Sequence, residues 1–128
     1  MAGISHFMVP ADDVARAKKF YNGVLGWTIT PVHDTPEMPG MDAMQYHEIR
    51  TGMVKAGTLS SGGLYKRHTN EPVLSFAEVQ DIDAAVARVE KLGGKITMPK
   101  TAIPGVGLVA MVLDSEGNMF GIWKPDRK

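Results

Sequence analysis

Apolar residues recur every three or four positions over residues 13–26, which predicts an amphipathic helix. The apolar positions are Val14, Ala17, Phe20, Tyr21, Val24 and Leu25. Asp12 or Asp13 can cap the first free amides, and Gly26 can take the left-handed conformation that ends a helix. Shorter apolar runs at residues 4–9 and 27–30 predict a strand on each side, so the opening unit is strand, helix, strand.

The same pattern returns later in the chain and predicts a second helix over residues 81–94. Its apolar positions are Ile82, Ala85, Val86, Val89 and Leu92. Asp13 aligns with Asp81 and Gly26 with Gly94, so both helices carry the same start and stop signals. Two amphipathic helices in a small α+β domain can also resemble each other without a repeat. The matching start and stop signals favour an internal repeat.

Further strands are predicted in both halves of the chain. In the first half they cover residues 44–50 and 54–59, with a turn at Thr51-Gly52 between them, and residues 61–66 close the half. In the second half, strands at 73–79, 95–98, 108–113 and 119–124 flank the helix, with a proline-rich loop over residues 99–107. Each half is then βαβββ. The predicted fold is α+β, a single domain over residues 1–128 made of two modules at about 1–66 and 72–125.

Composition narrows the possible functions. The 128 residues are 44% hydrophobic, which is enough to bury a core, and no apolar run is long enough to span a membrane. Lys plus Arg equals Asp plus Glu, at 14 each, so nucleic acid is not an expected partner. The chain has no cysteine, which excludes thiol chemistry and disulfides. No signal-peptide pattern stands at the N-terminus, so we expect a soluble cytoplasmic protein.

Three motifs in this order resemble the vicinal oxygen chelate superfamily, which includes glyoxalase I, bleomycin-resistance proteins and extradiol dioxygenases. They are an opening strand with His6 at its centre, Phe20-Tyr21 followed by Leu25-Gly26, and the closing segment from Asp114 to Trp123. The resemblance implies paired βαβββ modules whose curved mixed sheets carry helices on the convex face. It also implies a ligand or metal site in the concave face, and a homodimer, because such sites are usually built from four modules.

The metal-ligand positions that the resemblance implies fall on His6, Gly63, Leu74 and Gly121. Only His6 carries a donor atom, whereas a transition metal needs three or four. We therefore predict no metal ligands and no cofactor. The two glycines would instead leave room for a ligand on the cavity floor.

Strand alternation extends this set to a predicted ligand-binding site. Its residues are His6, Met8, Gly63, Leu74, Phe76, Glu78, Met119, Gly121 and Trp123. The lining is mostly apolar, as in many small-molecule pockets. His6 either hydrogen-bonds a ligand or is a structural polar group, and Glu78 is either a partner of His6 or a solvated end residue. No catalytic residue can be assigned, and the inward face of the strand 44–50 stays open.

The leading interpretation is a glyoxalase/bleomycin-resistance-like protein that binds a small, largely apolar molecule without metal. It would either sequester this molecule or act on it as an enzyme. The alternative is a metal-dependent lyase or dioxygenase-like enzyme using His6 with atypical ligands such as Glu78, Glu48 or His47. A third possibility is an interaction module whose cavity is filled.

Overall fold

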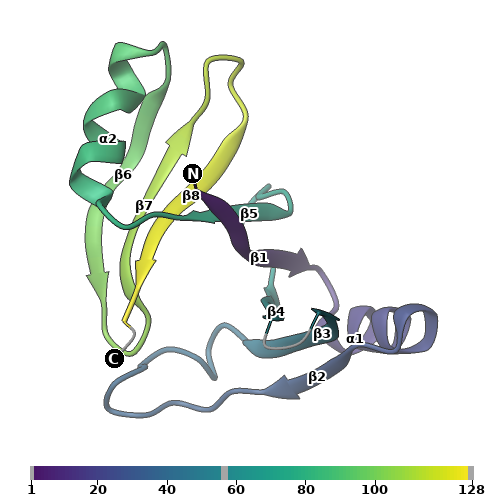
Figure 1. Ribbon diagram of the computed structural model, residues 1–128. Helices are drawn as coiled ribbons and strands as arrows, with labels where there is room; N and C mark the ends of the chain where they lie inside the picture. The colour runs from purple at the N-terminus through teal and green to yellow at the C-terminus, as the bar shows by residue number, and fades with distance from the viewer. Residues whose placement is uncertain (1, 56–57, 127–128) are drawn as a thin grey trace. The chain divides into compact units, whose positions relative to one another are not determined.

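The computed structural model describes residues 2–55 and 58–126. It contains two helices and eight strands, drawn in Figure 1. In chain order they are β1 (Gly3–Ala11), α1 (Val14–Leu25), β2 (Thr28–Pro31), β3 (His47–Lys55), β4 (Thr58–Lys66), β5 (Leu74–Glu78), α2 (Ile82–Lys91), β6 (Lys95–Ile103), β7 (Gly107–Leu113) and β8 (Met119–Pro125). The predicted α+β fold with two βαβββ modules is confirmed. Neither helix, at 12 and 10 residues, has the length and apolar character to cross a membrane, and no other helix occurs in the described ranges.

The chain divides into two compact units, which we describe separately. The N-terminal unit is residues 6–73, and the C-terminal unit joins the residues up to Ser5 to those from Leu74 onward. In the N-terminal unit the strand order is β2-β3-β4-β1, and in the C-terminal unit it is β5-β8-β7-β6. β1 runs parallel to β4, and β5 parallel to β8, whereas the other pairs are antiparallel. The two units therefore share one topology.

The predicted capping signals fix the start of both helices. The Asp13 carboxylate accepts a hydrogen bond from the Arg16 amide at 3.0 Å, so Asp13 rather than Asp12 caps α1. Gly26 ends that helix in the left-handed region, with φ of 70°. Asp81 caps α2 in the same way, accepting from the Ala84 amide at 3.0 Å.

Each helix packs on one face of its own four strands. The buried core of the N-terminal unit is Val9, Ala11, Val14, Ile29, Ile49 and Leu64. The ring of Tyr21 stacks on Trp27 at 5.3 Å and supports the end of α1. The core of the C-terminal unit is Ile82, Ala110, Val112 and Ile122, with Phe120 packed against it. Val9, Phe120 and Ile122 thus lie on the faces that pack against the helices.

Two predicted loops are wrong in position. β3 starts only at His47, because Met44 lies in a turn that includes Gln45 at φ of 51°. It then continues through Thr51 and Gly52 to Lys55. The pairing of β3 with β4 shifts in register between Arg50 and Lys55, and these shifts accommodate Gly52 inside the strand. The sequence pattern had placed a turn there.

The second misplaced loop is the proline-rich segment over residues 99–107. β6 continues through Pro99 as far as Ile103. Pro99 falls within a register shift between Met98 and Thr101, and β6 is the outer strand of its unit. A proline is tolerated there because an edge strand has one side that needs no ladder hydrogen bonds.

Candidate functional site

In each unit the sheet face that points away from the helix carries most of the predicted site residues. We call it the distal face. Side chains of a strand alternate between faces, and residues paired across strands share a face. Since Val9 and Ile122 pack towards the helices, Met8 and Gly121 belong to the distal faces of their units. The pairs Met8 with Gly63 and Phe76 with Gly121 occupy matching places in the two modules.

The distal face of the C-terminal unit is mostly apolar. One row across β5, β8, β7 and β6 is Phe76, Gly121, Met111 and Met98. The next row is Glu78, Trp123, Val109 and Thr101. Leu74 and Phe76 are each only 8% exposed, whereas Met119 at the strand end is 39% exposed. The structure therefore brings the predicted residues of β5 and β8 together on one face.

The expected open space at Gly121 is filled by the ring of Phe76. A Cβ atom at position 121 would lie 2.2 Å from Cδ2 and 2.3 Å from Cε2 of Phe76. The glycine is thus needed for the close approach of a cross-strand aromatic ring. The prediction that Gly121 leaves room for a ligand beside Trp123 is wrong.

Trp123 is oriented by a residue that the sequence did not single out. Its indole N–H donates to the hydroxyl of Ser5 at 3.1 Å. Ser5 lies at the start of β1, in the part that belongs to the C-terminal unit. A lone serine in a strand gives no sequence signal, and its role depends on tertiary pairing.

The distal face of the N-terminal unit is polar by contrast. One row runs from His6 through the backbone position of Ser61 to Arg50 and Thr28. The next row is Met8, Gly63, Glu48 and Thr30. This register settles the orientation of β3, which the sequence left open. Glu48 and Arg50 are distal, whereas His47 pairs with the core residue Leu64 and its Nδ1 lies 2.8 Å from the Gln45 carbonyl oxygen.

Gly63 is also covered by an aromatic side chain. A Cβ atom at position 63 would lie 2.2 Å from the hydroxyl oxygen of Tyr46. The room expected above Gly63 is therefore occupied, which corrects the second glycine prediction. Burial, helped by the negative charge of Glu48, raises the pKa of Tyr46 to about 12. The phenol stays protonated near neutral pH and can donate a hydrogen bond.

Glu48 and Arg50 form an ion pair beside Tyr46. Arg50 Nε donates to Glu48 Oε1 at 2.7 Å, and the two side chains are 57% and 43% exposed. This hydrogen bond raises the pKa of Arg50, which remains charged. Glu48 was predicted only as an atypical metal ligand, and neither Tyr46 nor Arg50 carries a sequence signal that marks it as a site residue.

His6 lies one row from Met8 and is largely buried. Burial lowers its pKa, because a charged imidazolium loses hydration there. Burial thus favours the neutral imidazole, whose ring nitrogens can donate or accept hydrogen bonds.

The residues at the metal positions implied by the resemblance do not fit a metal. Gly63, Leu74 and Gly121 offer no donor, and rings cover both glycines. Within residues 2–55 and 58–126, no three His, Cys, Asp or Glu residues are grouped as metal ligands would be. His47 and Glu48 point to opposite faces of β3 and cannot chelate one ion together.

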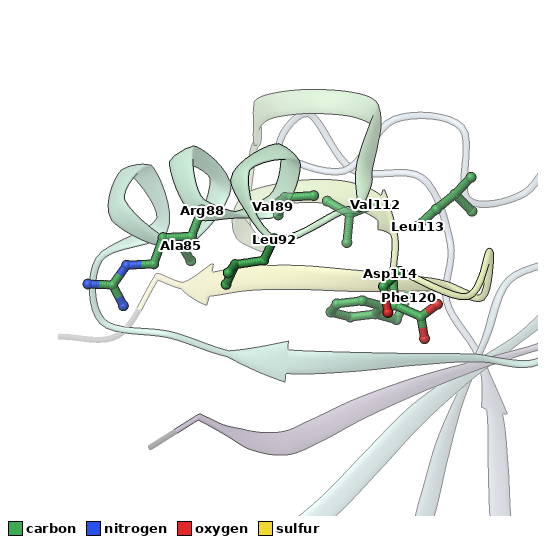
Figure 2. Close-up of a pocket in the computed structure, with 10 residues that line it drawn as sticks. Ala85, Arg88, Val89, Leu92, Val112, Leu113, Asp114 and Phe120 are labelled. Carbon is green, nitrogen blue, oxygen red and sulfur yellow. The ribbon is translucent and has the colours of Figure 1, made fainter.

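Cavities also occur in the C-terminal unit. An apolar one of about 250 Å³ lies between α2 and the strands β7 and β8, in the C-terminal unit (Figure 2). Its walls include Val89 and Leu92 from α2 and Val112 and Phe120 from the strands. A second, of about 320 Å³, is lined by Glu78 together with Ser5 and their neighbours. Of the predicted site residues, only Glu78 contributes to either cavity.

Comparison with known protein families shows to which family the chain belongs. Residues 3–122 match the Glyoxalase/Bleomycin resistance protein/Dioxygenase superfamily. The chain belongs to this superfamily. The match covers both βαβββ modules and agrees with the resemblance seen in the motifs around His6 and Trp123.

Curated proteins similar to this chain carry different names. The anthracycline biosynthesis protein DnrV of Streptomyces peucetius is 29% identical over 92% of this chain and 45% of its own length. The putative glyoxylase CFP32 of Mycobacterium tuberculosis is 26% identical over 90% of this chain and 42% of its own. The chain thus spans less than half the length of these curated relatives.

Solved structures show the same fold. A hypothetical protein from Bacillus halodurans C-125 superposes with a TM-score of 0.69, at 12% identity, over 99% of this chain and 96% of its own. Methylmalonyl-CoA epimerase from Mycobacterium tuberculosis gives 0.64, at 16% identity, over 98% of this chain and 89% of its own. At such identities the likeness establishes the fold alone.

Proposed function

We propose that this superfamily member binds a small, largely apolar molecule on the distal face of its C-terminal unit, without a metal ion. The observation that carries the proposal is the registered set of apolar side chains from β5, β8 and β7 around Trp123. Met111 and the Trp123 indole, which Ser5 holds, are the partly exposed apolar groups of this surface. Met119 lies at its rim, and Leu74 and Phe76 are buried in the same face. Such a surface with few polar groups is typical of small-molecule sites.

The relatives support a small-molecule role in general terms. One is named for anthracycline biosynthesis and another as a putative glyoxylase, and a solved epimerase of the same fold is in complex with methylmalonyl-CoA. All of these names concern small molecules. Whether the bound molecule is sequestered or converted is a second question, which follows once binding is measured.

Fluorescence of Trp123 tests the proposal. In a Trp27→Phe background, the uncharged probe N-phenyl-1-naphthylamine is titrated while indole and probe emission are recorded. We expect saturable binding, weakened about tenfold by Met111→Gln, because an amide would then be buried without a partner. The control Leu92→Gln changes the α2 cavity and should leave binding unchanged. Loss of binding in Leu92→Gln alone would place the probe in that cavity instead.

The proposed absence of a tight metal site rests on the donor set. Elemental analysis of tag-free protein should find zinc, nickel, iron and manganese well below one equivalent. A near-stoichiometric metal that disappears in His6→Ala would instead support the lyase or dioxygenase-like alternative.

We also propose a homodimer. On α1, the side chains of Phe20, Val24 and Leu25 are 60%, 63% and 52% exposed, which favours a partner surface there. Sedimentation at micromolar concentration should give twice the chain mass, and Phe20→Ser with Val24→Ser should shift it towards one chain mass. A wild-type monomer under these conditions would contradict the proposal.

A further inference from the structure

Two hydrogen-bond donors lie around one carboxylate on the distal face of the N-terminal unit. Tyr46 and Arg50 are two residues before and two residues after Glu48, and the charge of Glu48 acts on both. Glu48 is paired across the strands with Gly63, over which the Tyr46 ring lies. The phenol and the guanidinium are therefore held near the same point of the sheet.

The ion pair uses one edge of the guanidinium. Arg50 uses its Nε–H for Glu48, and its terminal nitrogens bind no residue within the described ranges. An arginine has five N–H donors in a planar fork that fits the two oxygens of an acid group. Contact with Glu48 at one edge fixes the fork, so that its other edge is oriented without a ligand present.

The surroundings favour an acid attached to an apolar group. Met8 and the ring of Tyr46 lie beside Gly63 in the same row and offer apolar surface. The Tyr46 hydroxyl makes no hydrogen bond to any described residue, and it remains a donor near neutral pH. The phenol and the second edge of the guanidinium together offer more hydrogen-bond donors than acceptors. This arrangement suits a ligand that carries acceptor oxygens.

We propose that Arg50 and Tyr46 bind the carboxylate or sulfonate of an apolar acid, with Glu48 as the residue that positions Arg50. This goes beyond the proposed function, which concerns the apolar face of the other unit. Because the Glu48–Arg50 pair is solvent-exposed, it adds little to stability, and substitutions in it should leave the fold intact.

A matched pair of probes tests the proposal. 8-Anilino-1-naphthalenesulfonate and N-phenyl-1-naphthylamine share the same aromatic skeleton, but only the first carries an acid. Arg50→Gln should weaken the binding of the sulfonate probe by roughly tenfold to a hundredfold, because charge-assisted hydrogen bonds are lost. The same substitution should leave the affinity for the uncharged probe unchanged. Tyr46→Phe should weaken the sulfonate probe by about threefold to tenfold.

Two controls separate position from charge. Arg88→Gln removes a cation that lines the α2 cavity and should alter neither probe. Glu48→Gln keeps an acceptor for Arg50 Nε and should retain sulfonate binding, whereas Glu48→Ala should weaken it. Equal effects of Arg50→Gln on both probes, no effect on the sulfonate, or the loss appearing in Arg88→Gln would each overturn the proposal.

Failure of the proposed function gives a different result. If neither probe binds the wild-type protein, apolar binding is refuted, and acid recognition is then decided by the Arg50 Nε–H resonance in NMR. Titration with benzoate should move this resonance and titration with benzamide should not. No shift with benzoate would refute the role of Arg50.

Discussion

Gly121→Ala offers a direct test of the packing on the distal face of the C-terminal unit. The added Cβ would lie 2.2 Å from Phe76 Cδ2, far inside van der Waals contact, so the ring must move. Gly121 does not have a positive φ, so alanine adds no backbone strain. We expect the free energy of unfolding to fall by about 1–3 kcal/mol, the usual cost of overpacking a core.

A double-mutant cycle isolates this contact. Phe76 is 8% exposed, and Phe76→Ala alone should cost about 3–5 kcal/mol. With the ring gone, Gly121→Ala has little left to displace. The double variant should therefore be more stable than the sum of the single effects predicts, by about 1–3 kcal/mol.

Urea unfolding followed by circular dichroism measures all four proteins. Gly52→Ala is the control, because nothing lies within 4 Å of a Cβ at that strand position, and its effect should stay within about 0.5 kcal/mol. Additive effects of Gly121→Ala and Phe76→Ala, within about 0.5 kcal/mol, would show that the ring does not cover the glycine.

Three further predictions concern single groups. Hydrogen bonds from the His68 amide and from Thr69 lower the pKa of Glu71 from an ordinary 4.5 to about 2. Its stabilising effect is therefore complete above pH 4.5 and lost as pH falls towards 2, and urea unfolding across this range should be flatter for Glu71→Gln. In a spectrophotometric titration one phenol should ionise near pH 12, absent in Tyr46→Phe, whereas titration of all tyrosines near pH 10 would contradict its burial. Asp13→Ala and Asp81→Ala should each cost about 1 kcal/mol in urea unfolding, and no loss would exclude them as caps.

Local signals were sufficient for the helices and for the order of elements. Asp13 and Asp81 cap helices through hydrogen bonds to amides three residues away, so their role depends on short-range geometry. Gly26 ends α1 for the same local reason. Strand alternation also grouped Met8 with His6, and Phe76 with Leu74, on one face of each strand, since side-chain direction in a strand has a fixed period.

Features that depend on register were not predictable in this way. Thr51-Gly52 carries a turn signal, but pairing with β4 keeps it inside β3. A glycine in a strand can leave a void or admit a neighbouring ring, and only the tertiary structure shows that Phe76 takes that place at Gly121. Tyr46 lies before β3 begins, so no alternation pattern could direct it to Gly63.

The contrast between the two distal faces has a consequence for how such a protein can evolve. Phe76 is part of a packed apolar surface, so most replacements of Phe76 would lower the free energy of unfolding. Glu48 and Arg50, on β3 of the other module, are solvent-exposed and can change with little effect on folding. Variation in the acid that is bound should therefore accumulate on β3, whereas β5 and β8, which carry the proposed apolar surface, should tolerate fewer replacements.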